Sequence, residues 1–325
     1  MSAEPIGAGT NSRVFRVELD DGSRGCPWHV VVKFYRRDAG DRRDRLTTEY
    51  ESLRFLWQND VRSIPRPIAI AHDRQCAIYE YVDGDVAGWA APDATDVDRS
   101  IEFLCLLKAL RGAAGSEALP AASEACFSVD AIVANVDRRL ERLRQAPEGD
   151  HAARMRRWID DTVTPFEIEA VKWARDAAAA AGIGFDKPLA TESRTLSPSD
   201  FGLHNAIRRP GGGLAFVDFE YFGWDDPAKT IVDFLLHPGM QLPDALKRRF
   251  AAKAQALFAD IPLLPERTRI VYPLFGLKWA VILLNDFLAE RFVHASGERR
   301  ALQLTKAQAL VDRVAGEYGN NPFLS

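Results

Sequence analysis

The stretch that decides the fold runs from residue 197 to residue 220. It reads Ser197-Pro198-Ser199-Asp200-Phe201-Gly202-Leu203-His204-Asn205, then Gly211-Gly212-Gly213, then Phe216-Val217-Asp218-Phe219-Glu220. Asn205 and Asp218 flank the three glycines, so a hairpin turning there would bring them face to face, with Cβ atoms about 5 Å apart. An amide oxygen and a carboxylate at that separation can share Mg²⁺, which prefers oxygen ligands. Asp200 adds a third polar group nearby. This stretch therefore predicts a site for a metal ion and phosphate.

Composition limits the kinds of protein that this chain can be. Its 325 residues, 47% of them hydrophobic, are enough for two domains or one two-lobed domain with a sizeable core. A net charge of -4 and a pI near 5.9 argue against general nucleic-acid binding, which needs a basic surface. We therefore expect a globular protein without a nucleic-acid partner.

Cysteine spacing and hydropathy bear on the compartment. Cys26, Cys76, Cys105 and Cys126 lack the spacing of a zinc site or a disulfide framework, which favours a reducing cytoplasm. The N-terminus lacks the basic and apolar regions of a signal peptide. The longest apolar stretch, Ile270 to Leu288, is interrupted by proline and polar residues, so we expect a buried helix and no membrane contact.

The first 84 residues predict a sheet-rich lobe. Residues 14–19 and 30–35 have the composition of strands, with a turn between them, and residues 68–70 and 76–82 supply two more. Apolar spacing from residue 46 to residue 57 is typical of an amphipathic helix packed on that antiparallel sheet. Asp83-Gly84-Asp85 has turn chemistry, and we place the boundary between lobes there.

Residues 85–325 predict a larger helical lobe. Helical patterns cover 97–111, 129–144 and 151–181, and four more follow at 229–236, 244–258, 267–288 and 297–318. The glycine-centred hairpin is the only clear strand pair expected in this lobe. The fold class is therefore α+β, with two lobes.

Two patterns in the sheet-rich lobe suggest phosphate binding. Gly7-Ala8-Gly9-Thr10-Asn11-Ser12-Arg13-Val14 leads into a strand, and glycines let backbone N–H groups approach an anion, although a simple turn is the alternative. Lys33 lies in an apolar strand, where its charge needs a partner unless it reaches solvent from an edge. Glu49 is the suitable partner; Glu51 is the rival, on another face of the same helix.

Taken in order, these motifs resemble the protein-kinase-like fold, and within it the aminoglycoside phosphotransferase and choline kinase superfamily. The resemblance covers almost the whole chain. It implies a nucleotide site formed by the glycine loop, the strand lysine, the helix glutamate and the hinge between lobes. The matching residues are Gly7, Gly9, Ser12, Val14, Lys33, Glu49, Glu80, Tyr81 and Val82. It also implies Asp200 as the catalytic residue, and Asn205 and Asp218 as ligands of Mg²⁺.

The catalytic loop departs from the family pattern at one position. The family usually has a histidine two residues before the catalytic aspartate, where this chain has Pro198. His204 is a candidate substitute. On a strand, however, it would point away from Asn205, so we expect a core or bracing role for it.

The segment after Asp218 favours a small-molecule kinase. Seven residues separate Asp218 from Asp226, which leaves no room for the long activation segment of protein kinases. Asp226 followed by Pro227 is typical of the start of a helix, and we expect a structural role for Asp226. Asp233 is a candidate loop-bracing residue.

Other charged residues have open interpretations. Glu220 shares the strand face of Asp218 and could bind a second Mg²⁺, contact substrate or lie at the strand exit. The run from Arg36 to Arg45 has mixed signs, which favours a solvated connection over an anion site. Asp286 and Glu290 are one helical turn apart and form either an acidic wall for a cationic acceptor or ordinary surface pairs.

The function that the resemblance implies is transfer of the γ-phosphoryl of ATP, or of GTP, to a hydroxyl of a small molecule, with Mg²⁺. The acceptor is not specified by the sequence, and we expect a monomer or homodimer. A pseudokinase that binds nucleotide without turnover is the alternative, favoured by Pro198 and opposed by the retained Lys33, Asp200, Asn205 and Asp218. Nucleotidyl transfer is a third class, which nothing in the sequence specifically supports.

Overall fold

The computed structural model describes residues 2–8, 11–19, 29–37, 43–88 and 91–324. The chain forms two compact units, each assembled from separate stretches of sequence. Unit 1 joins Met1–Ala125 with Thr195–Asp225, and unit 2 joins Cys126–Arg194 with Asp226–Ser325. The units are defined by which residues contact one another. They do not test the boundary between lobes after residue 84, which stays a prediction.

Unit 1 contains the predicted antiparallel sheet. Its strands are β1 (Ser2–Ala8), β2 (Ser12–Glu18), β3 (His29–Tyr35), β4 (Pro67–Ala71) and β5 (Cys76–Glu80). They lie in the order β1-β2-β3-β5-β4, and every neighbouring pair is antiparallel. The central strand β3 therefore has partners on both edges, which fixes the register of Lys33 opposite Val14 and Ala77.

The sequence did not predict strand β1. Its residues include Pro5 and Gly7, both of which are poor strand formers. An edge strand tolerates a proline, because one side of an edge strand needs no ladder hydrogen bonds. The register shifts between Pro5 and Gly7, so the strand bends where these two residues lie.

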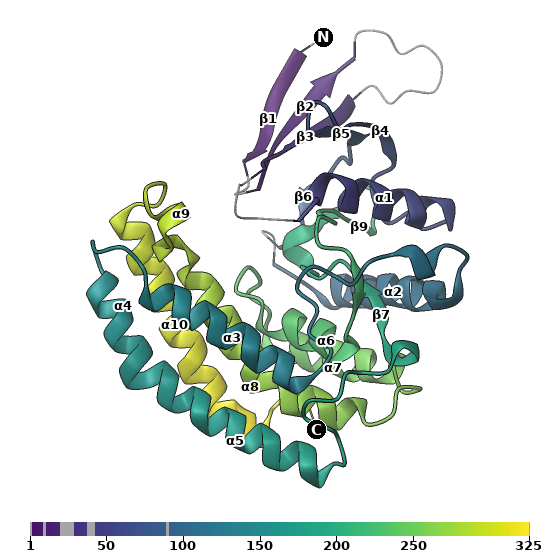
Figure 1. Cartoon of the computed structure of the whole chain (residues 1–325). Coiled ribbons are helices and arrows are strands. Elements are labelled where there is room, and N and C mark those ends of the chain that lie inside the picture. The colour runs from purple at the N-terminus through teal and green to yellow at the C-terminus, as the bar shows by residue number, and fades with distance from the viewer. Residues whose placement is uncertain (1, 9–10, 20–28, 38–42, 89–90, 325) are drawn as a thin grey trace. The chain divides into compact units, whose positions relative to one another are not determined.

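Helix α1 (Arg45–Gln58) packs against β4 and β5, below the sheet in the view of Figure 1. The Asp44 carboxylate accepts a hydrogen bond from the Thr47 backbone N–H at 3.1 Å, which caps the first turn. Leu46, Leu53 and Leu56 are buried on the face towards the sheet. The same face carries Glu49, so packing of the leucines determines where that carboxylate lies.

The rest of unit 1 surrounds the motif hairpin. Strands β8 (Ala206–Arg208) and β9 (Leu214–Phe216) form the hairpin, and β6 (Asp85–Val86) extends it on the other side of β8. Strands β7 (Thr195–Ser197) and β10 (Gly223–Asp225) form a further antiparallel pair. The hairpin was thus not the only strand pair after residue 84. Strands of two or three residues are too short to show a periodicity of two.

An aromatic cluster anchors the motif on helix α2 (Ala94–Ala109). The Phe103 ring lies 4.3 Å from the Phe216 ring and 6.0 Å from the Phe201 ring, measured between ring centres. Phe219 meets Phe103 edge-on at 6.2 Å. Phe201 and Phe219 directly follow Asp200 and Asp218 in the sequence, so burial of these rings holds the backbone of both aspartates.

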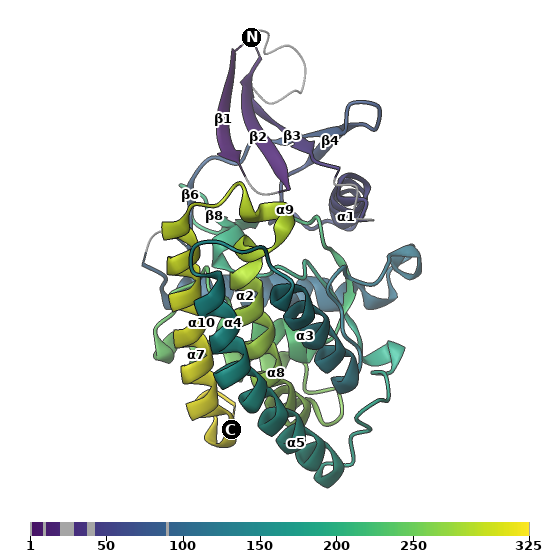
Figure 2. The ribbon, with the colours of Figure 1, turned by 60° about the vertical axis from the view of Figure 1, so that its left-hand side comes forward.

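Unit 2 is built around helix α8 (Leu264–Leu283). Figures 1 and 2 show α3 (Val129–Arg144), α5 (Thr164–Ala180) and α10 (Gly297–Glu317) alongside it, and α6 (Pro227–Leu236) also packs on it. The remaining helices are α4 (Ala152–Trp158), joined to α5 by a π-helical turn, α7 (Asp244–Leu257) and the short α9 (Ala289–Phe292). A helix that is buried on all sides is apolar all round, which explains the composition of α8.

One stretch, Leu264–Phe287, is long and apolar enough to span a membrane by length and composition alone. In the part of the chain that the structure describes, 78% of its most apolar window is buried against other elements. This is the burial that the sequence predicted for a core helix.

Candidate active site

The loop after β7 holds Asp200 through two neighbouring side chains. The His204 Nε2 atom lies 3.1 Å from one Asp200 carboxylate oxygen. The Asn205 side-chain amide donates to the Asp200 backbone carbonyl at 3.0 Å and to the second carboxylate oxygen at 3.3 Å. Because both oxygens of Asp200 have a neighbour, the orientation of this carboxylate is fixed.

The expected orientation of His204 is wrong. Residues 203–205 form a 3-10 turn, and β8 begins only at Ala206. The alternation of side chains along a strand does not apply in such a turn, so His204 and Asn205 reach the same carboxylate. The bracing interpretation of His204 agrees with this geometry, and the residue that it contacts is Asp200 itself.

The backbone is strained next to Asp200 and at Asp218. Ser199 and Asp218 both have φ of 67°, in the left-handed region that non-glycine residues rarely adopt. The Ser199 backbone N–H donates to the Ser197 hydroxyl at 3.0 Å, which stabilises the turn after Pro198. Residues held in such conformations cluster at functional sites.

The motif hairpin pairs one residue out of the predicted register. Ala206 lies opposite Phe216, and the Val217 N–H donates to the Asn205 carbonyl at 2.9 Å. Val217, and not Asp218, is therefore the cross-strand partner of Asn205. Asp218 follows at the bend after the strand, where its left-handed conformation turns the chain. The prediction assumed a hairpin that is symmetric in residue number about the three glycines. Residue numbers alone could not show that the pairing is offset by one residue.

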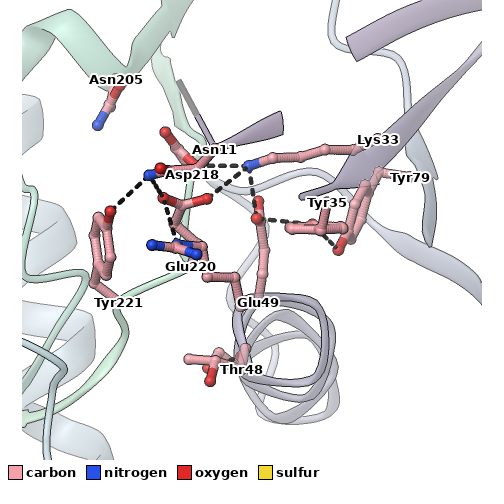
Figure 3. Close-up of polar contacts among 12 residues, drawn as sticks. Asn11, Lys33, Tyr35, Thr48, Glu49, Tyr79, Asn205, Asp218, Glu220 and Tyr221 are labelled. Atoms are coloured by element: carbon pink, nitrogen blue, oxygen red, sulfur yellow. Dashed lines mark hydrogen bonds and ion pairs between the residues drawn. The ribbon is translucent and has the colours of Figure 1, made fainter. Parts of the chain in front are cut away.

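Lys33 bridges two carboxylates from different elements. Its Nζ atom lies 2.7 Å from a Glu49 oxygen on α1 and 2.6 Å from an Asp218 oxygen (Figure 3). The Lys33 and Glu49 residues are 7% and 4% exposed, so this pair is shielded from water. The rival Glu51 instead pairs with Arg54 on the surface of α1.

Electrostatics make this cluster attractive to a cation. Burial raises the pKa of the Glu49 carboxyl to about 7, an effect that Lys33 opposes and Asp218 and Glu220 increase. Burial alone would lower the pKa of Lys33, but the three carboxylates outweigh it and raise that pKa well above its ordinary value. One ammonium among three acidic side chains leaves an excess of negative charge when all are ionised.

Glu220 lies in a buried cluster of donors. The Asn11 side-chain amide contacts its Oε1 atom at 2.6 Å and the Tyr221 hydroxyl at 2.7 Å. The Arg45 Nε atom lies 3.6 Å from Glu220, and Lys33 lies at 4.0 Å. Burial and the Asp218 charge raise the pKa of Glu220. These contacts connect Glu220 to the start of β2 and to the start of α1.

Arg45 is a residue that the sequence interpretation missed. It was grouped with a solvated run, of which residues 38–42 lie outside the described residues. The structure buries Arg45 at the first position of α1, next to Glu220. A signal was available, because Arg45 lies one helical turn before Glu49 and therefore shares its face of the helix.

Two buried tyrosines behind Glu49 were also missed. The Tyr35 hydroxyl donates to Glu49 Oε2 at 2.8 Å, and the Tyr79 hydroxyl lies 2.8 Å from that of Tyr35. Tyr35 follows Lys33 by two residues on β3, so the two side chains share one face of the strand. That spacing was the signal in the sequence.

Of the remaining predicted nucleotide-site residues, four lie on the same sheet, and Tyr81 and Val82 follow its strand β5. Gly7 belongs to β1, Ser12 and Val14 belong to β2, and Gly9 lies outside the described residues. Glu80 ends β5, and its backbone N–H donates to the Arg66 carbonyl at 2.8 Å. That N–H is therefore used within the protein, and the predicted adenine contact in the segment from Glu80 to Val82 stays a prediction.

Candidate residues in unit 2 have structural partners. Asp226 caps α6 by accepting from the Ala228 N–H at 2.9 Å, and Arg267 donates to it at 2.6 Å. Asp233 accepts from the Trp279 indole at 2.7 Å and pairs with Lys229 at 2.8 Å, which ties α6 to α8.

The predicted acidic wall does not form one helix face. Asp286 lies in a 3-10 turn, and Glu290 lies in α9 after the extended residue Leu288. Asp286 pairs with Arg299 at 2.6 Å, and Glu290 pairs with Arg142. Both carboxylates thus have arginine partners. The Glu290 pair is exposed, as surface pairing predicts, whereas the Asp286 carboxylate is buried.

The residues around Asp218 fit a divalent cation. Glu49, Asp218 and Glu220 each offer a carboxylate oxygen, and these oxygens lie within 4.8 Å of one another. Asp218 is the most accessible of the three, with 39% of its side chain exposed. Because the Asn205 amide nitrogen donates to Asp200, its amide oxygen is the atom left for a cation. Oxygen donors of this kind suit Mg²⁺.

Comparisons with known proteins agree with this geometry. Residues 2–266 match the model of the phosphotransferase enzyme family. A comparison with curated proteins finds no match. Among solved structures, a spectinomycin phosphotransferase in complex with ADP and spectinomycin is 11% identical, with a TM-score of 0.62 over 98% of this chain and 92% of that one.

Two further solved structures are a choline kinase and an ethanolamine kinase. Choline kinase from Streptococcus pneumoniae is 14% identical, with a TM-score of 0.60 over 96% of this chain and 94% of that one. Ethanolamine kinase from Plasmodium vivax is also 14% identical, with a TM-score of 0.58 over 96% and 81%. These likenesses confirm the predicted protein-kinase-like fold. Because the family model matches most of the length of this chain, the chain belongs to the phosphotransferase enzyme family.

Proposed function

We propose that this protein transfers the γ-phosphoryl group of ATP, or of GTP, to a hydroxyl group of a small molecule. The observation that carries the proposal is the position of the Lys33 Nζ atom, which lies 2.7 Å from Glu49 and 2.6 Å from Asp218. Phosphoryl transfer depends mainly on positioning and on neutralising charge, and this arrangement supplies both.

Each residue has a proposed part in the reaction. Lys33, oriented by Glu49, binds the α- and β-phosphates, and the segment from Gly7 to Val14 covers them. Asp218 and the amide oxygen of Asn205 hold Mg²⁺, which when bound neutralises charge on the β- and γ-phosphates. Glu220 lies beside this site and is not assigned as a ligand of Mg²⁺, because Asn11 and Arg45 already contact its carboxylate.

Asp200 is the proposed catalytic residue. Its carboxylate orients the acceptor hydroxyl and accepts the proton as the new O–P bond forms and the bond to the leaving nucleoside diphosphate breaks. The contacts from His204 and Asn205 fix the direction of the carboxylate before the acceptor binds. These contacts favour an active kinase over the non-catalytic alternative.

We propose a class of acceptor and not a single compound. The solved relatives named above are a spectinomycin, a choline and an ethanolamine kinase, all acting on small molecules with hydroxyl groups. Because a fold does not choose its substrate, we propose only a hydroxylated small molecule. The spacing of the four cysteines in the sequence supports a reducing cytoplasm as the compartment.

Turnover with a panel of hydroxylated metabolites tests the proposal. The wild-type protein with ATP and Mg²⁺ releases ADP only when an acceptor is present. Asp200→Asn lowers that rate by at least about 100-fold, because a positioned proton acceptor is lost, while ADP affinity is retained. Asp73→Asn, an exposed aspartate on the turn between β4 and β5, is the matched control and keeps full activity. Asp200→Asn with wild-type turnover would show that this assignment is wrong.

A further inference from the structure

Behind the Lys33–Glu49 pair lies a buried series of hydroxyl groups. The Tyr35 residue on β3 and the Tyr79 residue on β5 are 6% and 3% exposed, and Val31 pairs with Tyr79 across these strands. Figure 3 shows the two hydroxyls meeting on the side of Glu49 away from Asp218. We call Tyr79, Tyr35 and Glu49, in that order, the tyrosine series.

The direction of each hydrogen bond in the series follows from proton counting. A tyrosine hydroxyl carries one proton, and an ionised carboxylate can only accept. When Glu49 is ionised in its pair with Lys33, Tyr35 uses its proton on Glu49 Oε2 at 2.8 Å, so Tyr79 donates to the Tyr35 oxygen at 2.8 Å. Glu49 Oε2 therefore accepts from Lys33 and Tyr35 together, and Tyr79 strengthens the Tyr35 bond by polarising it.

Competition for Lys33 makes the anchoring of Glu49 consequential. The Lys33 ammonium lies 2.6 Å from Asp218 and 2.7 Å from Glu49, so two carboxylates attract it from different sides. A Glu49 side chain free to rotate would release Lys33 towards Asp218. The Tyr35 hydroxyl prevents that rotation, since it holds the same oxygen that Lys33 contacts. The Tyr35 ring also lies 5.2 Å from the ammonium, which adds a cation–π contact.

We propose that Tyr35, supported by Tyr79, is a positioning residue that sets the place of the Lys33 ammonium for nucleotide phosphates through Glu49. The proposal rests on the proposed function, because it assigns the Lys33 ammonium to phosphates. We assign neither tyrosine a contact with substrate, because their hydroxyls are used on Glu49 and on each other. Their effect is confined to the part of nucleotide affinity that depends on phosphate, and the adenosine part is independent of them.

Calorimetric affinities for adenosine and for ADP with Mg²⁺ separate the two parts. The ratio of the two dissociation constants measures what the phosphates contribute. Tyr35→Phe keeps the ring and removes the hydroxyl, and we expect it to reduce this ratio about tenfold, the effect of losing one hydrogen bond to a charged group. Tyr79→Phe reduces it less, because it removes only the bond to Tyr35.

Tyr50→Phe is the matched control. Tyr50 lies on α1 and its ring lies 6.4 Å from the Tyr79 ring, but its hydroxyl is not part of the tyrosine series. The ratio stays at the wild-type value in this variant. Thermal unfolding of all variants establishes that they are folded, and if Tyr35→Phe does not fold, Tyr79→Phe decides the question by the same selective loss.

The outcomes separate failure of this inference from failure of the proposed function. If wild-type protein binds ADP with Mg²⁺ no more tightly than adenosine, the proposed function is wrong and the inference fails with it. If the wild-type ratio is large and both tyrosine variants keep it, the inference alone is wrong. Equal losses of adenosine and ADP affinity in Tyr35→Phe would also overturn it, because they would show a merely structural role.

Discussion

At the scale of single residues, Asp200 is fixed by neighbours that lie four and five positions later in the sequence. His204 contacts one carboxylate oxygen at 3.1 Å, and Asn205 contacts the other at 3.3 Å. The usual histidine of the catalytic loop would come before the aspartate, where this chain has Pro198. In this chain the histidine that contacts the aspartate, His204, comes after it in the sequence.

This geometry predicts the effect of replacing His204. His204→Leu removes a polar contact to a charged group, so we expect kcat to fall about tenfold, with ADP affinity unchanged. His204→Gln keeps a donor in the side chain and loses less. Steady-state kinetics with an identified acceptor, together with calorimetry for ADP, measure the two effects. A His204→Leu variant with wild-type kcat would contradict the bracing role.

The helix period showed that only one of Glu49 and Glu51 could face Lys33, and the family resemblance selected Glu49, which the structure pairs with Lys33. The contacts of His204, Arg45 and Tyr35 were missed. His204 lies in a 3-10 turn, where neither the strand nor the helix period applies. Arg45 lies at the border between a charged run and a helix, and charge alone suggested that it was solvated. The catalytic and binding roles stay predictions.

At the scale of elements, long helices were predicted well and short strands were not. The predicted helix 129–144 has the bounds of α3, since its apolar residues repeat over four turns. Strands β6, β7 and β10 have only two or three residues each. They are strands because they pair with segments distant in the sequence, which local periodicity cannot predict. Strand β1 contains a proline and a glycine, so its existence depends on pairing with β2.

Close packing around β10 gives a prediction for a glycine that the sequence did not single out. A Cβ atom on Gly223 would lie 2.4 Å from the Pro120 carbonyl oxygen and 2.6 Å from the Ala122 nitrogen, both of them backbone atoms. Gly223→Ala should therefore destabilise the protein by about 2–3 kcal/mol, since the backbone must move. Chemical denaturation measures this change.

Gly211→Ala is the control for this experiment. The added methyl group meets no atom within 4 Å among the described residues, so we expect a change within about 0.5 kcal/mol. Equal stability of the two variants would show that β10 does not approach residues 120–122 as closely as described.

At the scale of the whole molecule, the order of elements could be predicted but their grouping could not. Residues 195–225 follow a long helical stretch, yet they pack with residues 1–125 in unit 1. Such a return of the chain depends on contacts distant in sequence, such as that between Phe103 and Phe216 at 4.3 Å. Local periodicity carries no information about them. The family resemblance supplied the expectation that the motifs converge.

The convergence of Lys33, Glu49 and Asp218 is the central claim, and the affinity for ADP with and without Mg²⁺ tests it most directly. We predict that Mg²⁺ strengthens ADP binding to the wild-type protein by about tenfold or more, because the cation neutralises both the carboxylates and the phosphates. In Asp218→Asn this gain is lost, while Asp73→Asn keeps it. Wild-type affinity for ADP that does not change with Mg²⁺ would contradict the account.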